Sequence, residues 1–169
     1  MFSLLVLIGC TTPKYSSLTN PNVDFEKYTT FYCINCLDAI DTKIPRYDNV
    51  PNREALRAAI QNEMEKRGHL QQEESPDLLV LLEIHVEDYV DTTANTIPSY
   101  RHWKGREVVA YNYRTGTVKI SLVDRVESTL IWQGSANGIL DKEPQKSVQR
   151  IDKAVEKIFN GYPIQISNN

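Results

Sequence analysis

The chain is 169 residues long, which is the usual size of one domain. Its apolar content of 41% and charged content of 24% are ordinary for a globular fold and exclude a disordered or fibrous protein. The net charge of −3 gives no basic excess of the kind that nucleic-acid-binding proteins carry, so we expect no nucleic-acid partner. A domain of this length can bury enough surface to be stable alone, and no cofactor is expected.

The amino terminus carries an apolar run, Phe2 to Ile8, that is followed by Gly9 and Cys10. A helix that spans a bilayer needs about 20 apolar residues, so this run is too short and has the length of a secretory signal core. The letters LIGC resemble the lipobox of bacterial lipoproteins, in which the cysteine sulfur receives a diacylglyceryl group and cleavage falls just before it. Lys and Arg normally precede such a run, and their absence indicates that the natural start lies upstream.

The lipobox resemblance implies a domain map and a location. We expect four segments: a signal-peptide remnant at 1–9, a flexible polar tether at 10–23, a single domain at 24–163 and a polar tail at 164–169. Acyl chains such as palmitate on Cys10 would hold the protein on a membrane. Thr11 stands where aspartate would resemble an inner-membrane retention signal, which favours the outer membrane, with the domain facing the periplasm of a Gram-negative bacterium. The alternative is a buried amino-terminal strand that ends in an unmodified cysteine.

Four segments have the composition and alternation of β-strands. They are TTFYCI at 29–34, LLVLLEIHVEDYV at 78–90, VVAYNYRTGTVKISLVD at 108–124 and TLIWQGSANG at 129–138. A turn around residues 125–128 joins the last two, which predicts an antiparallel hairpin.

Two segments have the apolar spacing of an amphipathic helix. Asn52 can cap the first, over 53–68, and Gly68 can end it. The second covers 144–161 and begins at Pro144.

The element order is therefore β-α-β-β-β-α. Two helices with one apolar stripe each can cover only one face of a sheet. We expect an α+β fold, a two-layer α/β sandwich in which both helices lie on one face of a four-stranded mixed sheet. The other face should expose polar side chains of the hairpin, namely Lys119, Ser121, Gln133 and Ser135.

Cys33 and Cys36 form a CxxC pair. Redox pairs of this kind stand at a helix amino terminus, whereas a loop with prolines follows here, and a metal site would need a second pair of ligands. Residues three apart in an extended strand lie about 10 Å apart, too far for a disulfide, although a turn at 34–35 would remove that objection. We favour structural or incidental cysteines over a disulfide, and both over a redox or metal role.

Glu83, His85 and Glu87 share one face of the second predicted strand, because alternate residues point the same way. Their side chains could in principle bind a metal ion. A solvated face of alternating charge is the simpler interpretation, so we expect no metal site.

The long loop before the third strand contains the letters YRHWKGR, at 100–106. Aromatic and basic residues of these types anchor protein interfaces, and they also suit the headgroup region of a membrane. The possible partner-binding residues are Tyr100, Arg101, Trp103, Lys104 and Arg106. The simpler alternative is a solvated loop with a self-packed tryptophan.

Several stretches together resemble the domain-of-unknown-function 4136 family of bacterial lipoproteins. They are DFEKYTTFYC, RGHLQQEESPDLLV, GTVKISLVDRVESTLIWQGSANG and the last helix with its ending FNGYP. Members often have a loop rich in Gly and Tyr before the third strand, where this chain has IPSYRHWKGR. The resemblance implies a lipid-anchored domain of the cell envelope with no established activity, and it assigns a role only to Cys10.

No pattern in the sequence predicts catalysis, so we expect a structural or protein-binding module rather than an enzyme. The competing hypothesis is a redox or hydrolytic enzyme that uses Cys33 and Cys36, or the cluster of Glu83, His85 and Glu87.

Overall fold

The computed structural model describes residues 13–37, 40–41, 43–44, 47–91, 111–139, 147–164 and 166. The sheet has six strands, which are β1 (Lys14–Thr19), β2 (Thr30–Cys33), β3 (Leu70–Gln71), β4 (Leu78–Asp91), β5 (Tyr111–Asp124) and β6 (Thr129–Ile139). A single 3-10 turn, η1 (Phe25–Lys27), precedes β2, and the α-helices are α1 (Val50–Glu65) and α2 (Ser147–Phe159).

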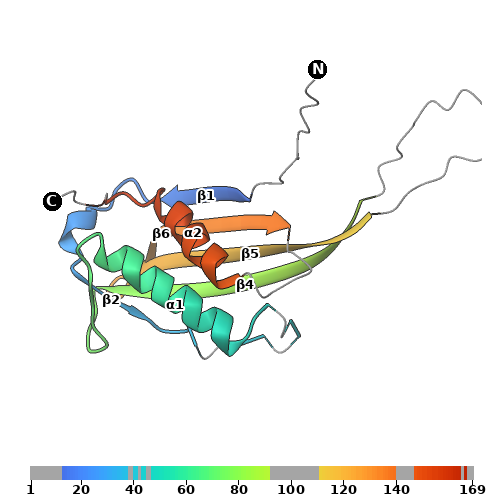
Figure 1. Ribbon diagram of the computed structural model, residues 1–169. Coiled ribbons are helices and arrows are strands. Elements are labelled where there is room, and N and C mark those ends of the chain that lie inside the picture. Colours follow the sequence, from blue (N-terminus) through green and yellow to red (C-terminus); the bar gives the residue numbers. More distant parts are fainter. Residues whose placement is uncertain are drawn as a thin grey trace, which may run out of the picture.

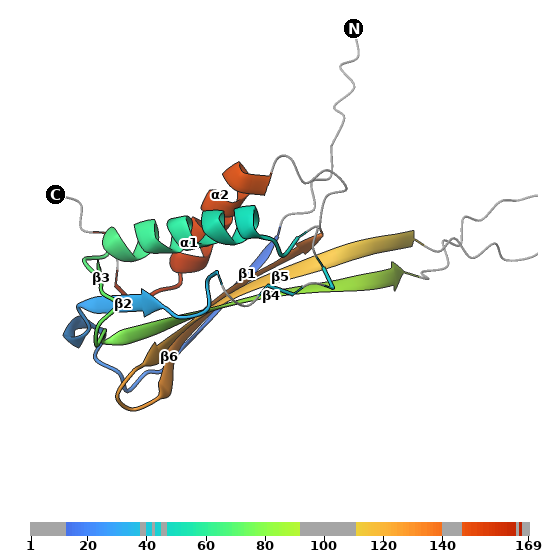
Figure 2. The same cartoon turned by 90° about the horizontal axis from the view of Figure 1, so that it is seen from below.

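The strands form one mixed sheet in the order β1-β6-β5-β4-β2-β3. β2 is parallel to β4, its neighbour on one side, and to β3, its neighbour on the other. The remaining pairs are antiparallel, including the predicted hairpin of β5 and β6. Both helices lie on the same face of the sheet, as Figures 1 and 2 show from two directions. The predicted α+β class and the one-sided helix layer are confirmed.

The prediction of four strands is wrong, because β1 and β3 were not expected. β1 falls inside the stretch 10–23, where the sequence predicts a flexible tether. Its letters KYSSLT show no apolar alternation, and the strand is held by backbone pairing with β6 from Lys14 opposite Asn137 to Thr19 opposite Trp132. β3 is only two exposed residues long and continues the sheet beyond β2.

α1 begins three residues earlier than the sequence predicts. Its cap is Asn49, whose side chain accepts a hydrogen bond from the Asn52 amide at 3.0 Å, and Pro51 lies in the first turn. Proline suits that position because the first amides of a helix have no partner within it. After the helix, Gly68 adopts a left-handed conformation with φ +88°, as expected for a residue that ends a helix. Neither α1 nor α2, the helices in the described part of the chain, is long and apolar enough to cross a bilayer.

The core lies between the helices and the sheet and centres on Trp132, which is fully buried. Its ring packs on Phe159 and Tyr162, with centroids 5.2 Å and 5.3 Å away, and its Nε1 donates to the Gly161 carbonyl at 3.0 Å. Gly134 makes room for this arrangement. A Cβ there would lie 2.4 Å from both the Trp132 ring and the Ile158 side chain. The aromatic cluster therefore fixes how α2 sits on β6.

The four polar residues expected on the opposite face do lie there, and each contacts a neighbouring strand or side chain. Lys119 forms an ion pair with Glu83 at 2.5 Å, and Gln133 donates to Ser121 at 3.0 Å. The hydroxyl of Ser135 lies 2.8 Å from that of Ser16 on β1. Ser121 differs from the expectation in being buried, because the Gln133 side chain covers it.

His69 follows α1 and is buried, with its Nε2 3.1 Å from the Tyr162 hydroxyl. Burial lowers the pKa of His69, because an imidazolium is poorly solvated there. An unfolded chain takes up a proton at this residue near pH 6.5, whereas the folded chain does so at lower pH. We therefore expect the free energy of unfolding to fall as the pH drops from 7 toward 5, by at most about 1.4 kcal/mol per pH unit.

Urea unfolding of the native chain and of His69→Gln across this pH range measures the effect. The exposed His85 provides the matched control, because His85→Gln removes a histidine without touching the buried site. Carboxylates with lowered pKa values, such as Asp48 and Asp124, change their protonation state near or below pH 4. Their contribution to the pH dependence of stability therefore falls below the range used for His69. Equal slopes in the native chain and in His69→Gln would contradict the prediction.

Candidate functional site

The candidate site begins where β2 ends. After Cys33 the chain turns, and the turn brings the Cα atoms of Cys33 and Cys36 to 5.7 Å, where the two residues form a disulfide. The preference for cysteines without such a bond is therefore wrong. The reason is that β2 stops at Cys33, so the spacing of an extended strand does not apply to this pair.

Asn35 lies inside the disulfide loop, and its side chain pairs with the β4 backbone in the way that a further residue of β2 would. Its amide oxygen accepts from the Leu82 backbone N–H at 2.7 Å, and its amide nitrogen donates to the Leu82 carbonyl at 3.1 Å. The last backbone pair between β2 and β4 joins Cys33 and Val80. The two bonds from Asn35 therefore satisfy the backbone N–H and C=O of Leu82, which β2 no longer reaches. The sheet edge is thus closed at Leu82 by one side chain.

A buried ion pair holds this turn against α1. Arg53 and Asp48 are 2% and 1% exposed, and the guanidinium donates to the carboxylate from Nε and from Nη2, the latter at 2.8 Å. Arg53 Nη1 also donates to the Asn35 carbonyl at 2.9 Å. The Asp41 backbone N–H donates to Asp48 at 2.8 Å. The pair therefore ties together the disulfide loop, the segment before α1 and the helix itself.

Two opposing effects act on the pKa of Asp48. Burial raises it, whereas hydrogen bonds from Arg53 and from the Asp41 amide lower it, and the net shift is downward. The carboxylate therefore stays ionised at neutral pH and keeps its contacts with Arg53.

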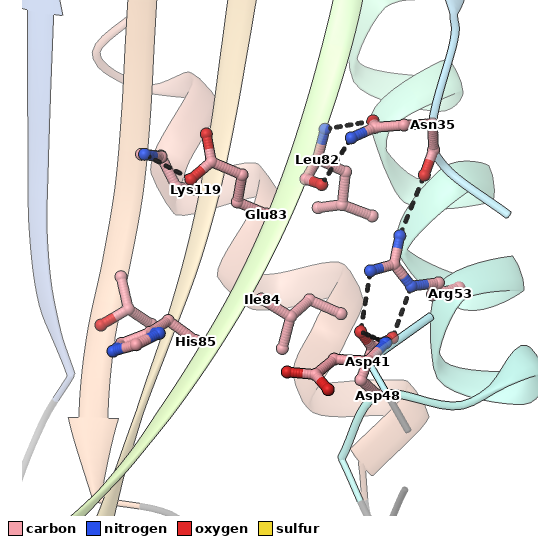
Figure 3. A pocket seen from close by; sticks show the side chains of 10 residues that line it. Asn35, Asp41, Asp48, Arg53, Leu82, Glu83, Ile84, His85 and Lys119 are labelled. Carbon is pink, nitrogen blue, oxygen red and sulfur yellow. Dashed lines mark hydrogen bonds and ion pairs between the residues drawn. The ribbon is translucent and has the colours of Figure 1, made fainter. Parts of the chain in front are cut away.

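A cleft of about 470 Å³ opens beside this network, along β4 (Figure 3). The residues that line it are Asn35, Asp41, Asp48, Arg53, Leu82, Glu83, Ile84, His85, Thr117 and Lys119. In Figure 3, Asp41, Asp48 and Arg53 lie on one side of β4, and Glu83, His85 and Lys119 lie on the other. The cleft thus combines an apolar strip with charged walls.

The β4 edge in this cleft presents backbone groups. The Val80 carbonyl accepts from the Ile34 amide, and both backbone groups of Leu82 bind Asn35, so even-numbered residues of β4 point their backbone toward this edge. The backbone N–H and C=O groups of Ile84 and Val86 point toward the same edge. In the described part of the chain, nothing pairs with them on this side. Such an edge can accept another extended segment.

The three residues considered as metal ligands are drawn into separate contacts. Glu83 pairs with Lys119, and the His85 ring lies 2.9 Å from the Glu87 carboxylate, with both of those side chains 68% exposed. Across the described ranges, no three His, Cys, Asp or Glu residues gather closely enough to hold a metal ion. This arrangement fits the charged, solvated strand face that the sequence favours.

Cys10 lies outside the described residues. So do the residues of the aromatic and basic loop: Tyr100, Arg101, Trp103, Lys104 and Arg106. Asn35, Asp48 and Arg53, which shape the cleft, were not predicted. One signal for the burial of Arg53 was available, because it lies one turn before Leu56, near the apolar stripe of α1. Its partner Asp48 could not be predicted, because it belongs to an irregular segment.

Comparison with known proteins shows the family of this chain, and that family is one of unknown function. Residues 16–164 match the family model "Domain of unknown function (DUF4136)", and the chain belongs to this family. No curated protein matches the sequence.

Two solved structures show the same fold at low sequence identity. A PDZ domain protein from Parabacteroides distasonis has a TM-score of 0.53 and 16% identity, and the match covers 94% of this chain and 38% of that one. The chain thus spans well under half the length of that protein. The PelC dodecamer from Paraburkholderia phytofirmans has a TM-score of 0.50 and 6% identity, with 88% of this chain and 96% of that chain covered. At these identities the likeness concerns the fold alone.

Proposed function

We propose that this protein is a lipid-anchored protein of the bacterial cell envelope whose domain faces the periplasm and binds another protein. The observation that carries the anchoring is the sequence LIGC at 7–10, which ends an apolar run with the thiol that would receive the lipid. The Cys33–Cys36 disulfide supports export, because disulfides persist in oxidising compartments such as the periplasm. Thr11 in place of aspartate favours the outer membrane over the inner one.

The binding role rests on the cleft beside β4. An incoming extended segment could pair with the backbone of Ile84 and Val86 and place alternate side chains against the apolar strip and the charged walls. Catalysis is less well supported, since Glu83 is paired with Lys119 and both cysteines of the CxxC pair are joined in a disulfide. A structural or binding module is therefore the function that we propose.

Replacing Cys10 by Ser should release the protein from the membrane fraction. The substitution removes the sulfur that carries the lipid, and the two or three acyl chains are what would hold the protein firmly. Carbonate washing of membranes followed by immunoblotting measures the release, and a density gradient separates inner from outer membrane. The double variant Cys33→Ser, Cys36→Ser is the control and should remain membrane-bound. Retention of Cys10→Ser after washing would contradict the anchor.

The binding surface can be tested with a photo-crosslinking residue at position 85. We expect it to give a discrete protein adduct in cells, whereas the same residue at Val126, 77% exposed on the far turn, should not. Val86→Pro should abolish the adduct while the fold persists, because the lost N–H points away from β5. Glu87→Pro is the matched variant: it removes a bond to β5 and should destabilise the domain. An undiminished adduct in Val86→Pro would contradict strand pairing at this edge.

A further inference from the structure

The chain is held on the sheet almost from the point where the lipid would be attached. β1 begins at Lys14, which pairs with Asn137 on β6. Pro13 already lies against the same strand, since a Cβ on Gly138 would meet the Pro13 side chain at 3.3 Å. The segment at 10–23 is therefore no long tether, because most of it is docked.

The remaining connection is short whatever path it takes. Only two residues separate Cys10 from Pro13. Three Cα–Cα steps span at most about 11 Å, so a lipid on Cys10 would keep this end of β1 close to the headgroups. By comparison, β6 runs about 27 Å from Thr129 to Asn137, at about 3.4 Å per residue. The molecule would thus be anchored by one end of its sheet.

The same end carries the most protruding part of the sheet. β6 finishes at Ile139 opposite Thr115, while β4 and β5 remain paired as far as Asp91 and Tyr111. Four further residues extend this two-stranded ribbon about 13 Å past β6. Figures 1 and 2 both show the ribbon reaching beyond the helices, on the side where β1 begins. The turn at 125–128 lies at the opposite end of β6.

We propose that the sheet end formed by the start of β1 and the tip of the β4–β5 ribbon faces the membrane, and that the ribbon tip touches the headgroups. This proposal rests on the lipid anchor of the proposed function. Pro13 lies level with Gly138, and from that level the ribbon extends five residues, about 17 Å, to Tyr111. The connection from Cys10 spans at most about 11 Å, so the ribbon tip reaches at least as far toward the lipid surface as Cys10 does. The partner of this surface is the lipid surface itself.

The test uses the full lipidated protein in vesicles of phosphatidylethanolamine and phosphatidylglycerol that contain a nickel-chelating lipid. Asn137→Cys and Val126→Cys each add a thiol for a fluorescent label at opposite ends of β6, since Cys10 carries the lipid and Cys33 and Cys36 are joined. We expect the headgroup nickel to quench the label at 137 several-fold more than the label at 126. Equal quenching, or stronger quenching at 126, would overturn the orientation.

Two further variants separate the possible causes. A 20-residue Gly-Ser insertion between Thr12 and Pro13 should keep the protein on vesicles but remove the difference between labels, and an unchanged difference would overturn the role of the short connection. A third label at Asn112→Cys, paired with Val90 near the ribbon tip, should be quenched at least as strongly as the label at 137, and weaker quenching there would overturn contact by the tip. Mass analysis comes first: protein without lipid on Cys10 refutes the proposed anchor, whereas lipidated protein with equal quenching refutes only the orientation.

Discussion

Replacing Arg53 by Met should lower the free energy of unfolding by about 3–5 kcal/mol, because it leaves the Asp48 carboxylate buried without its cation. Both side chains are almost fully buried, and the guanidinium makes two contacts with the carboxylate and one with the Asn35 carbonyl. Loss of the pair therefore also loosens the disulfide loop and the wall of the cleft. Urea unfolding at pH 7, followed by circular dichroism, measures the change.

Two variants sharpen this experiment. Glu54→Gln alters an exposed charge on the same helix turn and should change stability by less than about 0.5 kcal/mol. The double variant Arg53→Met, Asp48→Leu removes both charges and should recover a large part of the loss, because the main cost comes from the unpaired carboxylate. A value for Arg53→Met as small as that for Glu54→Gln would show that the pair does not support the fold.

Trp132→Ala should cost about 3–5 kcal/mol of unfolding free energy, because it empties the centre of the core. The ring contacts Phe159 and Tyr162, and its Nε1 satisfies the Gly161 carbonyl, so the variant removes packing and leaves a polar atom without its donor. Circular dichroism is the appropriate probe, because the variant removes one of the two tryptophans.

Trp132→Phe is the matched control for the aromatic cluster. It keeps a ring between β6 and α2 but loses the hydrogen bond, so we expect a smaller loss, of about 1–3 kcal/mol. Equal losses in the two variants would mean that the hydrogen bond, and not the packing of α2 on β6, dominates this region.

The central elements could be predicted because their side chains report their environment. β4 shows apolar alternation at Leu78, Val80 and Leu82, which are buried against the helices, and α1 repeats the same signal at a period of nearly four. β1 and β3 carry no such signal. Their residues are mostly exposed and pair through backbone atoms, which every residue except proline offers equally.

The candidate site could be predicted only in part. Alternation predicts the charged face of β4, and the structure shows that Glu83 and His85 on this face also line the cleft, which the sequence does not predict. The contacts of Asn35, Asp48 and Arg53 depend on how the disulfide loop packs against the segment before α1. These segments are irregular, so no periodic sequence pattern predicts their packing. The disulfide has the same origin, because the turn that follows β2 sets the distance between its cysteines.

The most direct test of the account is the intact mass of the protein purified from native membranes. A lipid-anchored protein should have lost residues 1–9, begin at Cys10, and carry a diacylglyceryl group on the sulfur with an acyl chain on the new amino group. An unmodified Cys10 thiol with residues 1–9 still attached would contradict the anchor and, with it, the proposed placement of the sheet on the membrane.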